Sequence, residues 1–117
     1  RALQREMARR RMMTEVPKAD VVVTNPTHFS VALKYDAEKM GAPVVVAKGR
    51  GILADNIIER ARASGVYVHE SRELLALLMQ IDLDSHIPPQ LYIVVAELLA
   101  WLYHLEEAEK AAPTLNA

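Results

Sequence analysis

The chain has 117 residues, a formal net charge of −1 and 51% hydrophobic residues. This size and composition predict one small domain with a modest core, and the near-neutral charge argues against a dominant nucleic-acid-binding surface. Cysteine is absent, which excludes disulfides, thiolate metal sites and cysteine nucleophiles. The sequence contains no apolar run of the roughly 18 residues that a transmembrane helix needs.

The first segment, residues 1–17, is predicted to be a basic helix. It consists of helix-forming residues and carries arginine at positions 1, 5, 9, 10 and 11. Pro17 is expected to end this helix. An isolated helix of this length is only marginally stable, so we expect the segment to be flexible unless it packs against something else.

Two apolar segments then flank a short polar turn. Residues 21–23 are all valine, and residues 29–33 alternate between apolar and small or polar positions. Both patterns are typical of β-strands. Residues 24–28, Thr-Asn-Pro-Thr-His, are therefore predicted to form a tight connection between two paired strands.

Asn25 followed by Pro26 indicates a possible self-cleavage site. Proline has no backbone N–H, so the next residue cannot attack the asparagine side chain in the usual way. The reverse attack remains open, because the side-chain nitrogen of Asn25 can add to its own backbone carbonyl. That reaction closes a succinimide, expels the Pro26 nitrogen and cuts the chain.

Two further residues of the turn are candidates to assist this reaction. Histidine is a common general base, so His28 is suited to remove a proton or to orient the amide. Thr27 is a candidate to stabilise the developing oxyanion or to fix the turn. A type II turn would give Thr27 a positive φ, which a β-branched residue resists, and such strain typically costs about 1–3 kcal/mol. Asn-Pro is also a common turn dipeptide, so a turn without chemistry is the competing interpretation.

The rest of the chain alternates between strands and helices. The expected elements are a buried strand over 44–47, a helix over 52–64 ended by Gly65, a strand over 66–69, a short helix capped by Ser71, and a last helix from Pro88 to about Glu109. The order predicts an α/β domain in which helices surround a small mixed β-sheet of about four strands. Residues 110–117 are expected to be a loose tail.

The motif Asn25-Pro26-Thr27-His28 resembles the cleavage motif of the FlhB/YscU family, the export-switch proteins of type III secretion. The resemblance extends to about residue 102. It is carried by four further blocks, which are similar to the flagellar branch of the family: residues 16–23, 29–35, 42–49 and 87–92.

The resemblance implies a self-cleaving cytoplasmic domain, residues 18–109, behind a membrane-embedded export gate. Residues 1–17 would then be the linker that follows the membrane region. Because the chain starts with Arg1, we expect it to be a fragment of a bacterial inner-membrane protein, located on the cytoplasmic side. Cleavage between Asn25 and Pro26 would occur once per molecule, without turnover, cofactor or metal, and the two pieces would stay associated in one sheet.

The family also implies a switch of export substrate, from rod and hook subunits to filament-type subunits. The implied partners are export-gate membrane proteins, the exported subunits and a hook-length control protein, with no role for nucleic acid. Two alternatives stay open: the equivalent switch protein of a virulence injectisome, and a non-cleaving docking module that presents Pro26 and His28 as contact residues.

A nucleotide-binding domain is a further alternative. Residues 49–54, Gly-Arg-Gly-Ile-Leu-Ala, match G-x-G-x-x-[GA] between a predicted strand and helix, and Glu70 follows the next strand. The chain is short for a dinucleotide domain, so we prefer the interpretation that the glycines permit a tight strand-to-helix turn. The histidines at positions 28, 69, 86 and 104 show no short paired spacing, so no metal site is expected.

Overall fold

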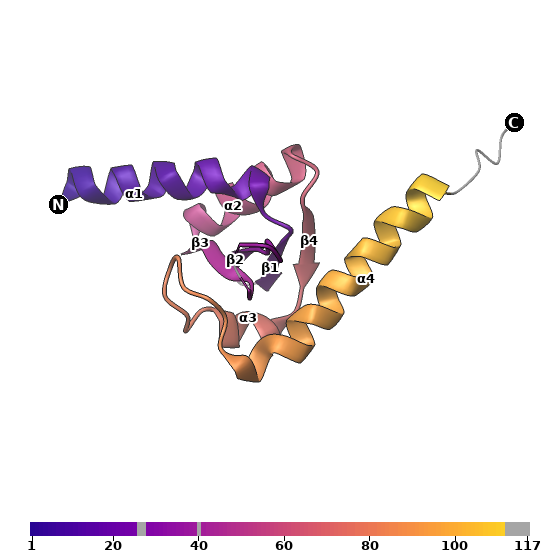
Figure 1. The fold of residues 1–117 in the computed structure, drawn as a ribbon. Coiled ribbons are helices and arrows are strands. Elements are labelled where there is room, and N and C mark those ends of the chain that lie inside the picture. The colour runs from indigo at the N-terminus through magenta and orange to yellow at the C-terminus, as the bar shows by residue number, and fades with distance from the viewer. Residues whose placement is uncertain (26–27, 40, 112–117) are drawn as a thin grey trace, which may run out of the picture. The chain divides into compact units, whose positions relative to one another are not determined.

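The fold was analysed in a computed structural model that describes residues 1–25, 28–39 and 41–111. The predicted α/β class is confirmed, with a four-stranded mixed sheet and helices around it (Figure 1). The elements are α1 (Ala2–Glu15), η1 (Val16–Lys18), β1 (Val21–Asn25), β2 (Phe29–Lys34), β3 (Val44–Arg50), α2 (Ile52–Ala63), β4 (Tyr67–Glu70), α3 (Arg72–Leu78), η2 (Pro89–Leu91) and α4 (Tyr92–Ala111). The chain divides into two compact units, Arg1–Ile87 and the segment from Pro88 onward.

The sheet has the strand order β3-β2-β1-β4. β1 and β2 form the predicted antiparallel hairpin, and β3 pairs antiparallel with β2. β4 pairs parallel with β1 on its other side, after the crossover through α2. β1 is thus an inner strand with a hydrogen-bonded neighbour on each side. Because β1 and β4 are parallel, their carboxyl ends lie at the same edge of the sheet.

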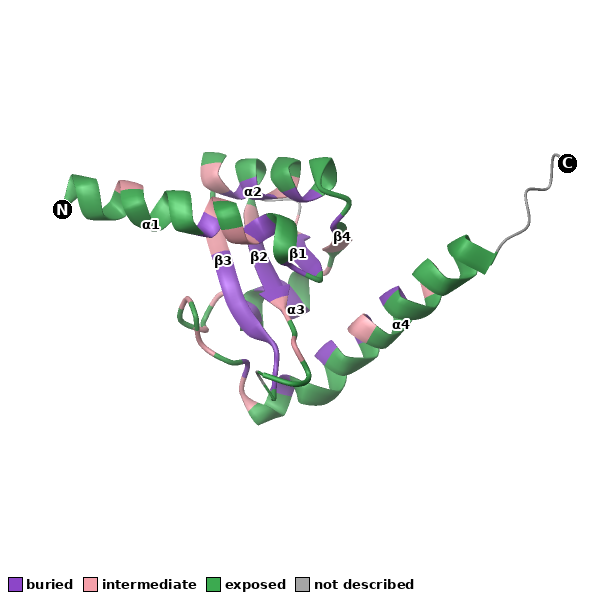
Figure 2. Cartoon of the chain, turned by 45° about the horizontal axis from the view of Figure 1, so that its top comes forward, coloured by how far each residue is buried: buried purple, intermediate pink, exposed green. Residues whose placement is uncertain are grey.

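Helices cover both faces of the sheet, with α1 and α2 on one side and α3 on the other (Figure 1). Successive residues of a strand point to opposite faces. Val22 therefore joins the core under α1 and α2, while Val21 and Val23 point toward the opposite face, where α3 contacts β1. All three valines are fully buried, which explains the continuous valine run in this strand (Figure 2).

Only the end of α1 belongs to the core. Met12 of α1 and the following Val16 are buried, whereas residues 2–11 are exposed apart from the half-buried Glu6. Arg11 forms a two-pronged ion pair with Asp84, with Nη1–Oδ1 and Nη2–Oδ2 distances of 3.2 and 2.7 Å. The hydrogen bond to this carboxylate raises the pKa of the Arg11 guanidinium, which is charged at physiological pH in any case.

α2 has a narrow buried face. Ala54, Ile57 and Ala61 are fully buried, and Ile58 is half-buried and packs against the same core. Ser71 caps α3 as predicted, since its Oγ accepts a hydrogen bond from the Leu74 amide at 3.3 Å.

The second unit consists of η2 and α4. α4 begins after the 3₁₀ turn that Pro89 opens, and it extends two residues beyond the predicted end at Glu109. Its buried residues, Val95, Leu98 and Leu102, follow helical spacing. Val94, next to the buried Val95, is exposed. Within the described range, no helix is long and apolar enough to cross a bilayer.

Candidate functional site

The candidate cleavage turn lies between β1 and β2. Asn25 is the last residue of β1 and pairs with Phe29, the first residue of β2. Three residues therefore connect the strands, and of these the structure describes His28; Pro26 and Thr27 lie outside the described residues. The hydroxyl of the buried Thr24 donates a hydrogen bond of 2.6 Å to the Phe29 carbonyl, which closes the base of the turn.

His28 has a left-handed backbone, with φ of 70°. A three-residue hairpin connection often ends in a left-handed residue, usually glycine. For a non-glycine residue this conformation costs about 1–2 kcal/mol, although histidine enters it more often than most residues. The backbone strain that the structure shows is at His28; the strain that the sequence predicts at Thr27 falls outside the described residues.

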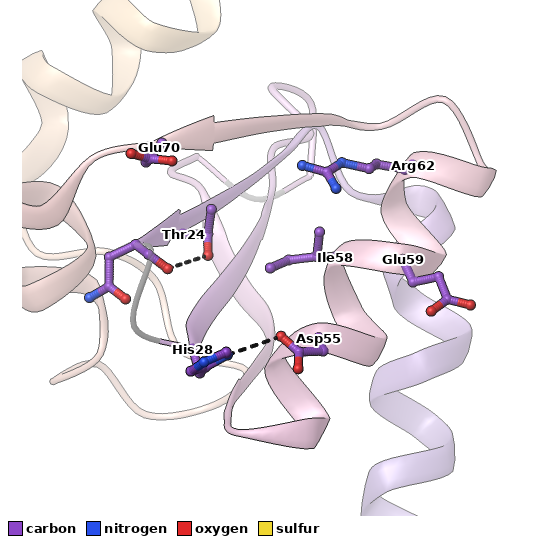
Figure 3. Close-up of a pocket in the computed structure, with 8 residues that line it drawn as sticks. Thr24, His28, Asp55, Ile58, Glu59, Arg62 and Glu70 are labelled. Atoms are coloured by element: carbon purple, nitrogen blue, oxygen red, sulfur yellow. Dashed lines mark hydrogen bonds and ion pairs between the residues drawn. The ribbon is translucent and has the colours of Figure 1, made fainter.

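Two contacts attach His28 to the start of α2. The backbone amide of Gly51, the N-cap residue, donates a hydrogen bond of 2.8 Å to the His28 carbonyl. In the side chain, Nδ1 of His28 lies 3.4 Å from Oδ1 of Asp55, in the first turn of α2 (Figure 3). Both side chains are mainly exposed, at 66% for His28 and 57% for Asp55. The imidazole is thus held on the α2 side of the turn.

The glycines of the G-x-G motif have structural roles here. Gly51 has φ of 62°, a left-handed conformation that a side chain would strain. A Cβ at Gly49 would lie 2.6 Å from Cγ of Leu53, so Gly49 allows close approach of β3 and α2. Because the Gly51 amide donates to the His28 carbonyl, this strand-to-helix turn supports the candidate cleavage turn.

An open pocket of about 460 Å³ borders the turn. Thr24 and Asn25 of β1, His28, and Glu70 at the end of β4 line it, together with residues from α2 (Figure 3). The α2 residues are Asp55, Ile58, Glu59 and Arg62. Three carboxylates and one guanidinium therefore line the pocket beside the described part of the candidate cleavage motif.

Sequence reasoning identified Asn25 and His28 but missed the groups that surround them. Both residues line one pocket. Asp55 is 27 positions away from His28, and only the β3–α2 turn brings it close. Glu70 was considered only as part of a nucleotide motif, whereas the parallel pairing of Thr24 with Glu70 places it beside the candidate cleavage turn.

Comparison with known proteins agrees with this architecture. The sequence profile of the FlhB HrpN YscU SpaS Family matches residues 1–102. The chain belongs to this family. The predicted resemblance to the FlhB/YscU family, which rested on the motif and its flanking blocks, is thereby confirmed.

The similarity to flagellar members is high. The chain is 51% identical over 105 residues to the flagellar biosynthetic protein FlhB of Bacillus subtilis (strain 168), covering 89% of this chain and 29% of that protein. It is 52% identical over 107 residues to FlhB of Escherichia coli (strain K12), covering 91% of this chain and 28% of that protein. The chain therefore spans less than a third of the length of these relatives.

The fold matches a solved structure of the same family. The crystal structure of the cytoplasmic domain of FlhB from Shewanella putrefaciens aligns with a TM-score of 0.83 and 39% sequence identity, covering 91% of this chain and 82% of that one. This FlhB/YscU-family chain thus has the fold of the cytoplasmic domain of a flagellar relative.

Proposed function

We propose that this chain cleaves itself between Asn25 and Pro26 by asparagine cyclisation. The observation that carries the proposal is the position of Asn25 at the end of the inner strand β1, with His28 held in a strained conformation beside it. Pairing with Phe29 of β2 positions the Asn25 backbone, and the preceding Thr24 is paired on both sides, so the reacting carbonyl has a defined position.

The reaction is an isomerisation in which no atom is gained or lost. Nδ2 of Asn25 attacks its own backbone carbonyl carbon and gives up a proton, and a bond from carbon to Nδ2 forms. The bond from that carbon to the Pro26 nitrogen then breaks, and the Pro26 nitrogen takes up a proton. One piece ends in a succinimide at position 25, and the other begins at Pro26.

The side chains of the turn have separate roles in this proposal. Asn25 is the nucleophile, Pro26 supplies the leaving nitrogen, and Thr27 shapes the turn. His28 takes the amide proton and delivers a proton to the leaving nitrogen, the usual work of a histidine in acid–base catalysis. Each molecule reacts once, so this is autoproteolysis without enzymatic turnover, and it requires no cofactor.

We further propose that cleavage serves a switch in flagellar protein export, from rod and hook subunits to filament-type subunits. The high identity to flagellar FlhB sequences supports the flagellar branch rather than an injectisome. The chain would then act on the cytoplasmic side of the bacterial inner membrane. Its partners would be export-gate membrane proteins, exported subunits and a hook-length control protein.

A time course of chain cutting with two variants tests the cleavage proposal. The chain is incubated at neutral pH, denatured and separated by size, alongside Asn25→Ala and His28→Ala. Asn25→Ala should abolish cutting because it removes the nucleophile, and His28→Ala should slow it about 10²-fold or more, as loss of a general base does. An Asn25→Ala chain that still cuts after position 25 contradicts the cyclisation mechanism.

The same experiment distinguishes self-cleavage from the alternative of a non-cleaving docking module. That alternative requires the parent chain to stay whole while the domain is folded. Circular dichroism of each variant shows whether the fold is retained, so an uncut chain that is folded would favour docking through the turn.

A further inference from the structure

We propose that Asp55 is a positioning residue for the self-cleavage, which it assists by orienting His28 and fixing the position of its ring proton. This inference rests on the proposed function, since it assigns a role within the same reaction. Asp55 touches no reacting atom, and its action passes through the imidazole of His28.

The geometry gives His28 two anchors on the first turn of α2. The Gly51 amide donates a hydrogen bond of 2.8 Å to the His28 carbonyl, which places His28 beside the start of α2. In the side chain, Oδ1 of Asp55 lies 3.4 Å from Nδ1 of the ring, within hydrogen-bond distance. Asp55 has its own fixed position, because its amide donates to the Gly51 carbonyl at 3.1 Å in the first hydrogen bond of the helix. The same residue, Gly51, therefore connects both anchors.

The contact determines which ring nitrogen carries the proton. An ionised carboxylate only accepts hydrogen bonds, so Nδ1 of His28 must be the donor in this pair. In the neutral imidazole the other nitrogen, Nε2, is then unprotonated and able to accept a proton. Asp55 thus leaves Nε2 as the basic atom that would take the Asn25 amide proton in the proposed reaction.

The expected contribution is modest because both side chains are mainly exposed. Exposed ion pairs contribute up to about 1 kcal/mol, which corresponds to a rate effect of roughly two- to fivefold. The main catalytic contribution stays with the turn itself and with His28.

Cleavage rates of matched variants test the inference. Asp55→Ala should cut about two- to fivefold more slowly, and Asp55→Glu should recover part of this loss. The control, Glu73→Ala, removes an exposed acidic residue from the first turn of α3 instead, and should cut at the parent rate. An unchanged rate in Asp55→Ala overturns the inference.

A double-mutant cycle distinguishes positioning from general support of the fold. If Asp55 acts only through the imidazole, adding Asp55→Ala to His28→Ala should slow cutting no further. A full additional loss in the double variant overturns the positioning role.

A spectroscopic measurement keeps the inference testable even if the parent chain does not cleave. In the folded Asn25→Ala chain at mildly alkaline pH, the ¹⁵N shifts of His28 report which ring nitrogen is protonated. We expect the proton to lie on Nδ1 when Asp55 is present. When Asp55→Ala is added to the same chain, we expect a larger fraction of rings with the proton on Nε2. An Nε2-protonated ring with Asp55 present overturns the inference, whereas an uncut parent chain alone contradicts only the proposed function.

Discussion

His28 combines a backbone and a side-chain role in one residue. Its φ of 70° lets the chain enter β2 in register with Asn25, and its ring reaches Asp55. The two roles have different physical origins, because the backbone conformation favours glycine while the chemistry requires an imidazole. Substitutions can therefore separate them.

We predict that His28→Gly and His28→Ala cleave equally slowly but differ in stability. Both lack the imidazole, whereas only alanine keeps a Cβ in the left-handed region, so the glycine variant should be about 1 kcal/mol more stable. Urea unfolding of both variants in the Asn25→Ala background, where the chain stays whole, measures the difference. Equal unfolding midpoints would mean that the turn does not hold residue 28 at positive φ.

At the scale of elements, periodicity was sufficient to predict the hairpin and the strand–helix–strand order of β3, α2 and β4, and Ser71 indicated the cap of α3. The valine run reflects burial on both faces of β1, whereas the alternation in β2 does not follow burial, since Ser30 and Ala32 are as fully buried as Val31. The site was only half predicted, because Asp55 and Glu70 reach the turn through tertiary pairing and carry no local signal.

α1 should be stable only near its carboxyl end. Met12 is buried, and Arg60 donates a hydrogen bond of 3.3 Å to the Met13 carbonyl, whereas almost all of residues 2–10 is exposed. Because short helices without packing are marginal, we predict that backbone amides of residues 5–10 exchange with solvent at least about tenfold faster than those of α2. Equal protection of the two helices in hydrogen-exchange mass spectrometry would contradict this.

At the scale of the whole molecule, the strand order determines what cleavage would do to the fold. A cut after Asn25 leaves α1, η1 and β1 on one piece and the other three strands on the second piece. β1 remains between β2 and β4, with Val21, Val22 and Val23 fully buried. Burying one valine side chain contributes about 1.5–3 kcal/mol, so burial of these three side chains strongly favours association of the two pieces.

We therefore predict that both pieces co-elute as one species in native size-exclusion chromatography. They should separate only in denaturant, because separation requires an inner strand to leave the sheet and expose its valines. The uncut Asn25→Ala chain is the matched control and should elute at the same volume. Independent elution of the two pieces without denaturant would contradict the inner position of β1.

The central claim is most directly tested by the intact mass of the denatured chain after incubation at neutral pH. We predict two species, one ending at Asn25 and one beginning at Pro26. Their masses should sum to that of the uncut chain while the succinimide persists, and to one water more after it hydrolyses. A single uncut mass from folded protein, or a cut at any other bond, would contradict self-cleavage at this turn.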